Sequence, residues 1–368
     1  MSPKFFIKLL FIFIAITNSR LTATPGSQVI GKVVDERTQN PVVWVNVFLA
    51  NTTLGCASSD KGNFEINNIP QGVYHLVFQH IGYEIKVIKL NCLHSNIREL
   101  NIALVPKILS GEKIQITAPQ NKQWKKDLKI FQQEFLGKTE NSKKCKIVNP
   151  EVLNFSANPA QKELIAMTDS LLLVNNYALG YHIRIVLDTF RLSAAEDHYY
   201  FSIYPHFIEM SPENEKEKQK WEKKRFETYL GSLKHFWKSL IADKTRENDF
   251  LLYRVDGLKN KSGTPIDSVD FLNKSYFDGM KEVNFSKYLR ILYTDYRKSK
   301  LVTTGFSPYR QESYSQMNYP KSTIVFENTP VLINREGRCL TPDFIQVYGY
   351  FASQRVADLL PHEYSPNN

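Results

Sequence analysis

A chain of 368 residues is long enough for two or three domains, and its 42% apolar and 12% aromatic residues are typical of a globular protein and exclude a disordered chain. The formal net charge of +10 indicates a basic surface, which we interpret as solvated. An anionic membrane surface or an acidic polymer is the alternative partner, whereas nucleic acid is not expected.

Residues 1–23 have the features of a secretory signal peptide. Two lysines lie near the start, and an unbroken apolar run follows from Leu9 to Ile16. This run is too short for a hydrocarbon core, which needs about 20 residues. We expect cleavage near Ser19 or Ala23, with an uncleaved membrane anchor as the alternative. The mature protein is then exported, has no transmembrane segment, and acts in the periplasm or at the outer membrane.

Residues 28–106 alternate short strands with turn residues, which is the pattern of an all-β sandwich of about seven strands. Gly62 lies in the tight turn before one of these strands, and the turn from Pro70 to Gly72 separates that strand from the next. Another strand is expected to direct alternate side chains to the core and to the opposite side, namely Val43, Val45, Val47 and Leu49 inward and Trp44, Asn46, Phe48 and Ala50 outward.

Several motifs of this stretch occur together, namely Gly31-Lys-Val33-Val-Asp35, the turn from Thr38 to Pro41, Asp60-x-Gly62-x-Phe64, Ile69-Pro70-x-Gly72-x-Tyr74 and Ile81-Gly82-Tyr83. This set resembles the carboxypeptidase regulatory-like domain, a prealbumin-like β-sandwich. The resemblance implies an accessory module that does not itself cut peptides. Such domains also precede the plug of TonB-dependent receptors, but this chain is too short for a plug and barrel.

The four cysteines are too few for a disulfide scaffold and lack the paired spacing of a zinc site. Cys56 and Cys92 both fall in the predicted sandwich, so a disulfide between them and buried free thiols are both open. The pairing of Cys145 and Cys339 is equally open.

Residues 107–123 form a predicted linker, with a short strand at 112–118, and residues 124–368 a predicted α+β domain with an antiparallel sheet. Apolar residues from Trp124 to Phe135 recur at helical spacing before Gly137. Strands are expected at 164–167, 171–174, 181–190, 199–207, 250–255, 288–293, 322–327, 331–334 and 344–351. A surface loop is expected within 276–319, and a short helix at 354–361.

Residues 213–243 predict one long amphipathic helix, charged in its first half and apolar along one face of its second half. A polar row on this helix is the candidate ligand-binding site, because arginine binds carboxylate or phosphate groups and the other side chains supply hydroxyls and an imidazole. Its members are Arg225, Tyr229, Ser232 and His235, with Asn175 and Tyr181 from neighbouring strands. The alternative interpretation is a polar helix edge that bonds to neighbouring strands.

The second half also carries distinctive motifs, namely Trp124-x-x-Asp127-Leu, Phe135-Leu-Gly137, Asn141-x-x-x-Cys145-x-Ile-x-Asn149-Pro150, Asn175-x-x-Ala178-Leu-Gly180-Tyr181, Arg225-x-x-x-Tyr229-x-Gly231-Ser232-x-x-His235-Phe236 and Gly349-Tyr350 through Pro361. They resemble the carboxypeptidase-like regulatory domain-containing proteins of Gram-negative envelopes, although Phe351 replaces an expected tryptophan. The resemblance implies no established reaction.

The sequence matches known catalytic motifs only weakly. His206-x-x-Glu209 has the spacing of a zinc pair but lies in a predicted strand, where a structural histidine is the simpler interpretation. The sequence around Ser307 lacks the second glycine of a nucleophile elbow, and Pro308 obstructs the helix that should follow. We therefore expect no metal and no cofactor.

The sequence leaves three functions open. The first is a non-catalytic exported binding or structural module that contacts envelope proteins or the outer-membrane surface. The second is a hydrolase with an unrecognised active site in residues 120–368. The third is an accessory protein that docks onto a TonB-dependent or surface-glycan uptake system. A cleft that gathers Arg225 and His235 with a carboxylate favours the hydrolase, whereas an exposed aromatic patch favours docking.

Overall fold

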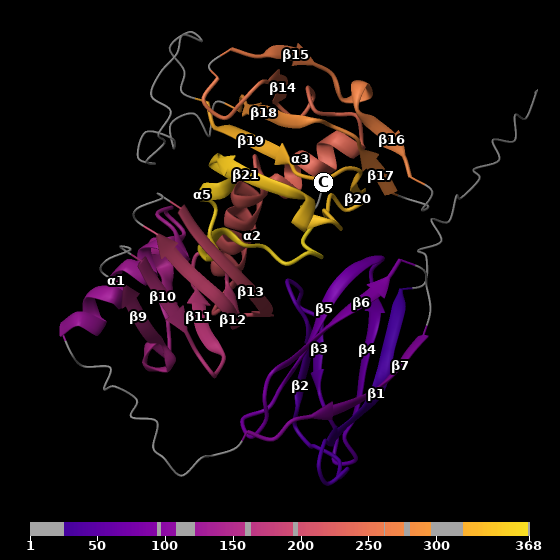
Figure 1. Cartoon of the computed structure of the whole chain (residues 1–368), viewed down its shortest axis with the longest axis vertical. Coiled ribbons are helices and arrows are strands. Elements are labelled where there is room, and N and C mark those ends of the chain that lie inside the picture. Colours follow the sequence, from indigo (N-terminus) through magenta and orange to yellow (C-terminus); the bar gives the residue numbers. More distant parts are fainter. Residues whose placement is uncertain are drawn as a thin grey trace, which may run out of the picture.

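The computed structural model describes residues 26–93, 97–107, 122–158, 163–193, 198–260, 262–275, 280–295 and 319–366. The predicted signal peptide, most of the linker with its strand, and much of the predicted surface loop lie outside these residues. The described chain forms a sandwich (26–107), a middle lobe (122–229) and a last lobe (233–353), as Figure 1 shows. A closing segment (354–366) follows the last lobe.

The sandwich consists of two sheets with the strand orders β4-β1-β7 and β3-β2-β5-β6. Residues that alternate along each strand face inward and form one hydrophobic core between the sheets. This arrangement confirms the predicted seven-stranded sandwich. Its strands are β1 (Ser27–Asp35), β2 (Asn46–Leu49), β3 (Gly55–Ala57), β4 (Asn63–Ile69), β5 (Gly72–Gln79), β6 (Lys86–Cys92) and β7 (Ile97–Leu104).

A polar network at the end of β1 connects three of the sandwich motifs, namely Gly31 to Asp35, the turn from Thr38 to Pro41, and Ile81-Gly82-Tyr83. The Asp35 carboxylate accepts hydrogen bonds from the backbone N–H groups of Arg37 (2.9 Å) and Thr38 (2.8 Å) and from the Tyr83 hydroxyl (3.0 Å). These donors, the Thr38 N–H first, lower the pKa of Asp35. The network joins the turn after β1 to the turn after β5.

The middle lobe is built on one antiparallel sheet in which β12 is central. One edge of β12 pairs with β11 and then with β10, and the other edge pairs with β13 along its whole length. The elements are α1 (Lys122–Leu136), β8 (Cys145–Ile147), β9 (Asn154–Asn158), β10 (Glu163–Met167), β11 (Leu172–Asn176), β12 (Tyr181–Ser193), β13 (His198–Glu209) and α2 (Glu215–Tyr229).

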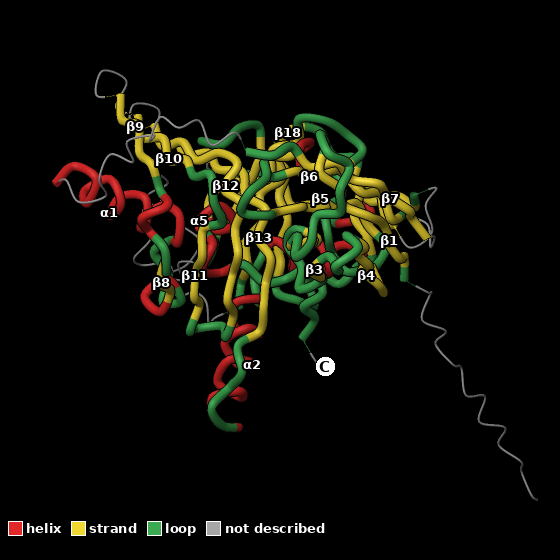
Figure 2. The backbone as a smooth tube through the Cα atoms, turned by 90° about the horizontal axis from the view of Figure 1, so that it is seen from below, coloured by secondary structure: helices red, strands yellow, loops and turns green. Residues whose placement is uncertain are grey.

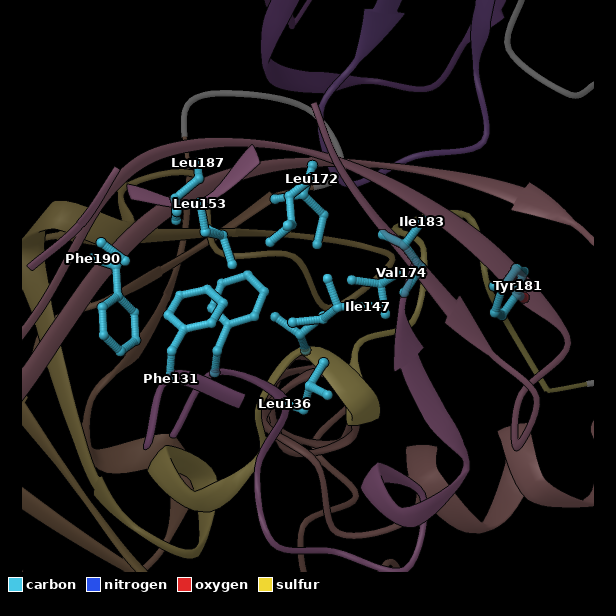
Figure 3. Close-up of a cluster of buried hydrophobic side chains, with 14 of the residues drawn as sticks. Phe131, Leu136, Ile147, Leu153, Leu172, Val174, Tyr181, Ile183, Leu187 and Phe190 are labelled. Atoms are coloured by element: carbon cyan, nitrogen blue, oxygen red, sulfur yellow. The ribbon is translucent and has the colours of Figure 1, made fainter. Parts of the chain in front are cut away.

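Helix α1 covers one face of this sheet with its apolar side, as predicted. Phe131 and Phe135 are fully buried and meet Phe190 of β12, as Figure 3 shows for Phe131 and Phe190. The helix ends before Gly137, whose φ of +95° suits a residue without a side chain. The aromatic contacts between helix and sheet form the core of the middle lobe.

The predicted single helix 213–243 is wrong at one point, because the chain breaks it into α2 and α3 (Leu233–Ile241). Gly231 lies at the break with a φ of +71°, and a Cβ there would approach the Tyr293 ring to 2.6 Å. Ser232 then caps α3 by accepting a hydrogen bond from the His235 backbone N–H (3.1 Å). The predicted polar row therefore spans two helices.

The last lobe packs α3 against sheets with the orders β15-β14-β18-β19-β21 and β16-β17-β20, around a separate core. The predicted fold class, mainly β with helices and antiparallel sheets, is confirmed. The elements are β14 (Phe250–Val255), β15 (Thr264–Ile266), β16 (Leu272–Lys274), β17 (Met280–Val283), β18 (Lys287–Tyr293), β19 (Lys321–Phe326), β20 (Val331–Asn334), β21 (Ile345–Gly349) and α5 (Tyr350–Ser353).

The closing segment differs from the helix predicted for 354–361. Only a short 3-10 helix forms there, Val356–Asp358, and Val356 packs into the core of the middle lobe. Farther on, the Lys234 ammonium of α3 donates to the carbonyls of His362 (2.7 Å) and Tyr364 (2.5 Å). Figure 1 marks the C-terminal end of the chain beside α3 and β20 of the last lobe.

The β3-β2-β5-β6 sheet of the sandwich meets the other lobes, and we call this contact the junction. The turn after β2 lies along β13: the Phe207 N–H donates to the Thr52 carbonyl (2.9 Å), and His206 stacks on Phe48 at 4.8 Å. At the start of β5, the Arg338 guanidinium lies over the Tyr74 ring at 3.9 Å. These contacts fix the sandwich to both other lobes.

Candidate functional site

Arg225 and Tyr181 of the predicted polar row lie together in the middle lobe. The Arg225 guanidinium donates to the carbonyls of Leu179 (2.8 Å) and Gly180 (3.3 Å) and to the Glu209 carboxylate (2.9 Å). Its plane lies 4.0 Å from the centre of the Tyr181 ring. The side chain thus joins α2 to the start of β12 and the end of β13.

Tyr229, Ser232 and His235 lie together around the helix break. The His235 Nδ1 accepts from the Gly231 backbone N–H (3.0 Å), and its ring contacts Tyr229 at 4.9 Å. Burial raises the pKa of Tyr229 to about 12. Asn175 lies apart from both groups, where its side chain bonds to Tyr177 (3.0 Å) and His182 (2.7 Å).

Most of the polar row therefore forms two separate clusters. In both clusters the polar atoms named above bond to neighbouring parts of the chain. That arrangement follows the alternative interpretation, a polar edge that joins secondary-structure elements. Arg225 has a carboxylate partner in Glu209, but His235 belongs to the other cluster, so the pairing that favours a hydrolase does not occur here. Ligand binding by these residues stays a prediction.

We expect Arg225→Met to lower the free energy of unfolding by about 1–3 kcal/mol, because it leaves the Leu179 and Gly180 carbonyls without this donor. Urea denaturation of the full chain measures this loss. The matched control is Glu209→Gln, which removes only the exposed ion pair and should cost less than about 1 kcal/mol. An unchanged stability in Arg225→Met would contradict a joining role.

The suspected zinc pair does not converge. His206 lies in the junction, whereas Glu209 bonds to Arg225 on the far side of β13. In the part of the chain that the structure describes, no three His, Cys, Asp or Glu side chains are placed to hold a metal ion. All four cysteines are free thiols, and Cys56 and Cys92 lie toward opposite ends of their sheet.

A groove of about 680 Å³ crosses the outer face of the β4-β1-β7 sheet. Lys32, Glu65, Glu99 and Asn101 are among its lining residues. Glu65 already accepts hydrogen bonds from Gln28 and Asn67, each of 2.8 Å. The groove therefore presents side chains of mixed charge, and it includes no member of the predicted polar row.

The sandwich exposes large apolar side chains in the loops before β2, after β5 and after β7, and we call Val43, Trp44, Ile81 and Val105 the apolar end. Trp44 is 69% exposed and Ile81 is 88% exposed. β2 begins and β5 ends at this end, since Asn46 pairs with Gln79. Val105 lies beside the same turn, because its carbonyl accepts from the Glu84 N–H (2.9 Å).

Trp44 has a backbone conformation that tryptophan rarely adopts, with a φ of +57°. Buried Ser58 holds this loop: its carbonyl accepts from the Trp44 N–H (3.0 Å), and its hydroxyl accepts from the Val45 N–H (2.9 Å) and donates to the Val42 carbonyl (2.8 Å). Left-handed backbone at a bulky residue costs of the order of 1–3 kcal/mol. Such strain at an exposed aromatic side chain is typical of functional positions.

Alternation does not predict this exposed region, because the alternating pattern extends back to residue 43. The strand starts only at Asn46, and Val43 is exposed instead of facing the core. The prediction that Trp44 and Phe48 face outward is correct, and the structure gives them different roles, since Phe48 is covered at the junction. The available sequence signal for this region was the pair of large aromatic residues, Trp44 and Phe48, on the outward face.

The Asp35 network, the two-sheet sandwich and its junction with further lobes define an accessory β-sandwich module within a larger chain. Residues 29–116 match the family model of the CarboxypepD_reg-like domain. The sandwich therefore matches a CarboxypepD_reg-like domain, which is a non-catalytic fold. This confirms the family predicted from the motifs of the first domain. No curated protein matches the chain.

Solved structures give only distant likenesses. A cohesin–X-dockerin complex from Acetivibrio cellulolyticus is 19% identical over 22% of this chain and 57% of its own, with a TM-score of 0.20. A protein from Bacteroides uniformis with a proposed carbohydrate-binding role is 10% identical over 50% of this chain and 80% of its own, with a TM-score of 0.19. A Bacteroides fragilis protein of unknown function, proposed to be membrane-associated, is 12% identical over 51% of this chain and 84% of its own, with a TM-score of 0.17. The chain thus spans less than two thirds of the Acetivibrio chain, and such low scores support no functional conclusion.

Proposed function

We propose that the protein is an exported, non-catalytic binding module of the periplasm or outer membrane that docks onto another envelope protein through the apolar end of its sandwich. The observation that carries this proposal is the exposure of Trp44 and Ile81 in the loops before β2 and after β5. A protein of a TonB-dependent or surface-glycan uptake system is the partner class we propose. Within the described residues, no helix is long and apolar enough to cross a membrane.

The chemistry of the apolar end suits a protein partner. Tryptophan is enriched among the residues that contribute most to protein–protein binding, because it buries a large rigid surface on contact. Burial of apolar surface contributes about 25 cal/mol per Å². The bonds from Ser58 hold the Trp44 backbone before any partner arrives, which reduces the entropy lost on binding.

The junction supports the same role. It holds the sandwich against the middle and last lobes through backbone bonds to Thr52 and through the contact between Arg338 and Tyr74. The apolar end is therefore presented in a fixed orientation to the rest of the chain. A partner bound there would be positioned relative to all three lobes.

We expect Trp44→Gly to leave the protein at least as stable as the wild type, with a gain of up to about 1 kcal/mol, because glycine adopts a positive φ without strain and the lost side chain is exposed. Thermal unfolding of the purified mature chain measures this. A clear loss of stability would show that Trp44 supports the fold, which would contradict a binding role.

The same variant tests the proposed function in the envelope. Mild detergent extracts of cells that carry the tagged protein should contain a stoichiometric partner polypeptide with the wild type and lack it with Trp44→Gly. The control is Leu251→Ser, which changes a partly exposed apolar residue of the last lobe. Recovery of the same polypeptide with all three proteins would contradict docking through the apolar end.

A further inference from the structure

Helix α1 carries an outer face made almost entirely of lysine. Lys122, Lys125, Lys126 and Lys129 are all exposed and follow each other at spacings of three, one and three residues, and we call them the lysine face. The opposite side of the helix buries Phe131 and Phe135 in the middle lobe. The helix therefore has an apolar inner side and a cationic outer side.

The charges of the lysine face have no neutralising partners in the described part of the chain. None of the four lysines forms an ion pair there. The only carboxylate among residues 122–133, Asp127, is buried and bonds to Gln123 (2.8 Å). Glu134, one turn farther on, pairs with Lys138 (2.8 Å).

This arrangement works against the stability of the isolated helix. Lysines three and four residues apart on a helix repel each other. Lysines in the first turn also face the positive end of the helix dipole, and α1 has no acidic residue in that turn. Binding of an anionic surface would relieve both effects.

Helix α2 shows that the chain can arrange lysines differently. Glu215 and Glu217 occupy its first turn, and the Asn214 side chain caps it by accepting from the Glu217 N–H (3.0 Å). Ion pairs join Lys218 to Glu215 (3.7 Å) and Lys224 to Glu227. The unpaired charge of α1 is thus a property of that helix and not of every lysine-rich part of the chain.

The position and shape of α1 fit a broad, flat partner. Figures 1 and 2, seen from perpendicular directions, both place α1 at the periphery of the molecule. Ile130 is 41% exposed beside the lysine face. A row of point charges with an adjacent apolar side chain is suited to phosphate headgroups with acyl chains beneath them.

From these observations we infer that the lysine face of α1 binds the phosphate headgroups of an anionic membrane surface, with Ile130 entering the headgroup layer. Each lysine near such a surface adds a favourable electrostatic contribution to binding. This inference goes beyond docking through the apolar end, because it involves a different lobe and a lipid partner. The protein would then contact the membrane and an envelope protein at separate surfaces.

The test measures binding of the mature full chain to vesicles of phosphatidylcholine alone or mixed with phosphatidylglycerol, at 50 mM salt. We compare the wild type with the triple variant Lys125→Glu, Lys126→Glu, Lys129→Glu. The control variant Lys216→Glu, Lys218→Glu, Lys220→Glu makes the same change in net charge on α2. The wild type and the control should bind only the anionic vesicles, and the α1 variant should bind at least tenfold more weakly.

The inference is overturned by no wild-type binding to anionic vesicles, by an equal loss in both triple variants, or by equally tight binding to double-stranded DNA of matched charge concentration. The α1 variant should melt no lower than the wild type, because it removes lysine repulsion. If it fails to fold, glutamine at the same three positions gives the same comparison. Wild-type binding that persists unchanged in 500 mM salt would also contradict an electrostatic contact.

Discussion

Phe131→Ala should lower the free energy of unfolding by about 3–5 kcal/mol, the usual cost of removing a buried phenylalanine. The Phe131 side chain is fully buried, stacks on Phe135 at 4.7 Å and meets the edge of Phe190 at 4.7 Å. Its loss leaves a cavity between α1 and β12. Chemical denaturation followed by tryptophan fluorescence measures the effect, since Trp124 lies in α1.

The control for this prediction is Phe226→Ala on α2. Phe226 is 41% exposed, so its removal should change the free energy of unfolding by less than about 0.5 kcal/mol. Equal effects of the two substitutions would mean that α1 does not pack on the sheet as described. The lysine face would then lose its support, because its orientation depends on that packing.

Acid should destabilise the protein through His206 by up to about 3 kcal/mol. Burial in the junction, helped by the Arg184 cation, lowers the pKa of His206 from 6.5 to about 4. Between these two pH values the unfolded chain binds a proton that the folded chain does not. Stability therefore falls as the pH decreases from about 6.5 to about 4, and the loss is complete below that range.

Denaturation midpoints at pH 7 and pH 4.5 test this prediction in the wild type and in His206→Gln, which cannot titrate. The variant should lose distinctly less stability between the two pH values. Some loss will remain, because burial also lowers the pKa of His362 in the closing segment. Identical losses in both proteins would show that His206 is not desolvated by the sandwich.

Much of the fold follows from local sequence signals. Alternating residues predict the strands of the sandwich and of the middle lobe, and the spacing from Trp124 to Phe135 predicts α1, because these patterns depend on which face is buried. The helix break at Gly231 was missed because the charged and apolar patterns on either side continue through it. The positive φ of Gly231 is set by the close approach of Tyr293, a contact distant in sequence.

The candidate site was less predictable for the same reason. The residues Arg225 and His235 fit one helical row only if the helix is continuous, and the break assigns them to separate clusters. The exposure of Trp44 depends on where β2 begins and on the bonds from Ser58, neither of which alternation specifies. The burial of Phe48 depends on His206, which lies in another lobe.

Docking through the apolar end is tested most directly by photo-crosslinking in intact cells, with a photoreactive amino acid at position 81 or, as the control, at position 226. Our account predicts a discrete adduct from position 81 that disappears when Trp44→Gly is added, and no adduct of that mass from position 226. The absence of an adduct at position 81, or the same adduct from both positions, would contradict the proposed docking surface.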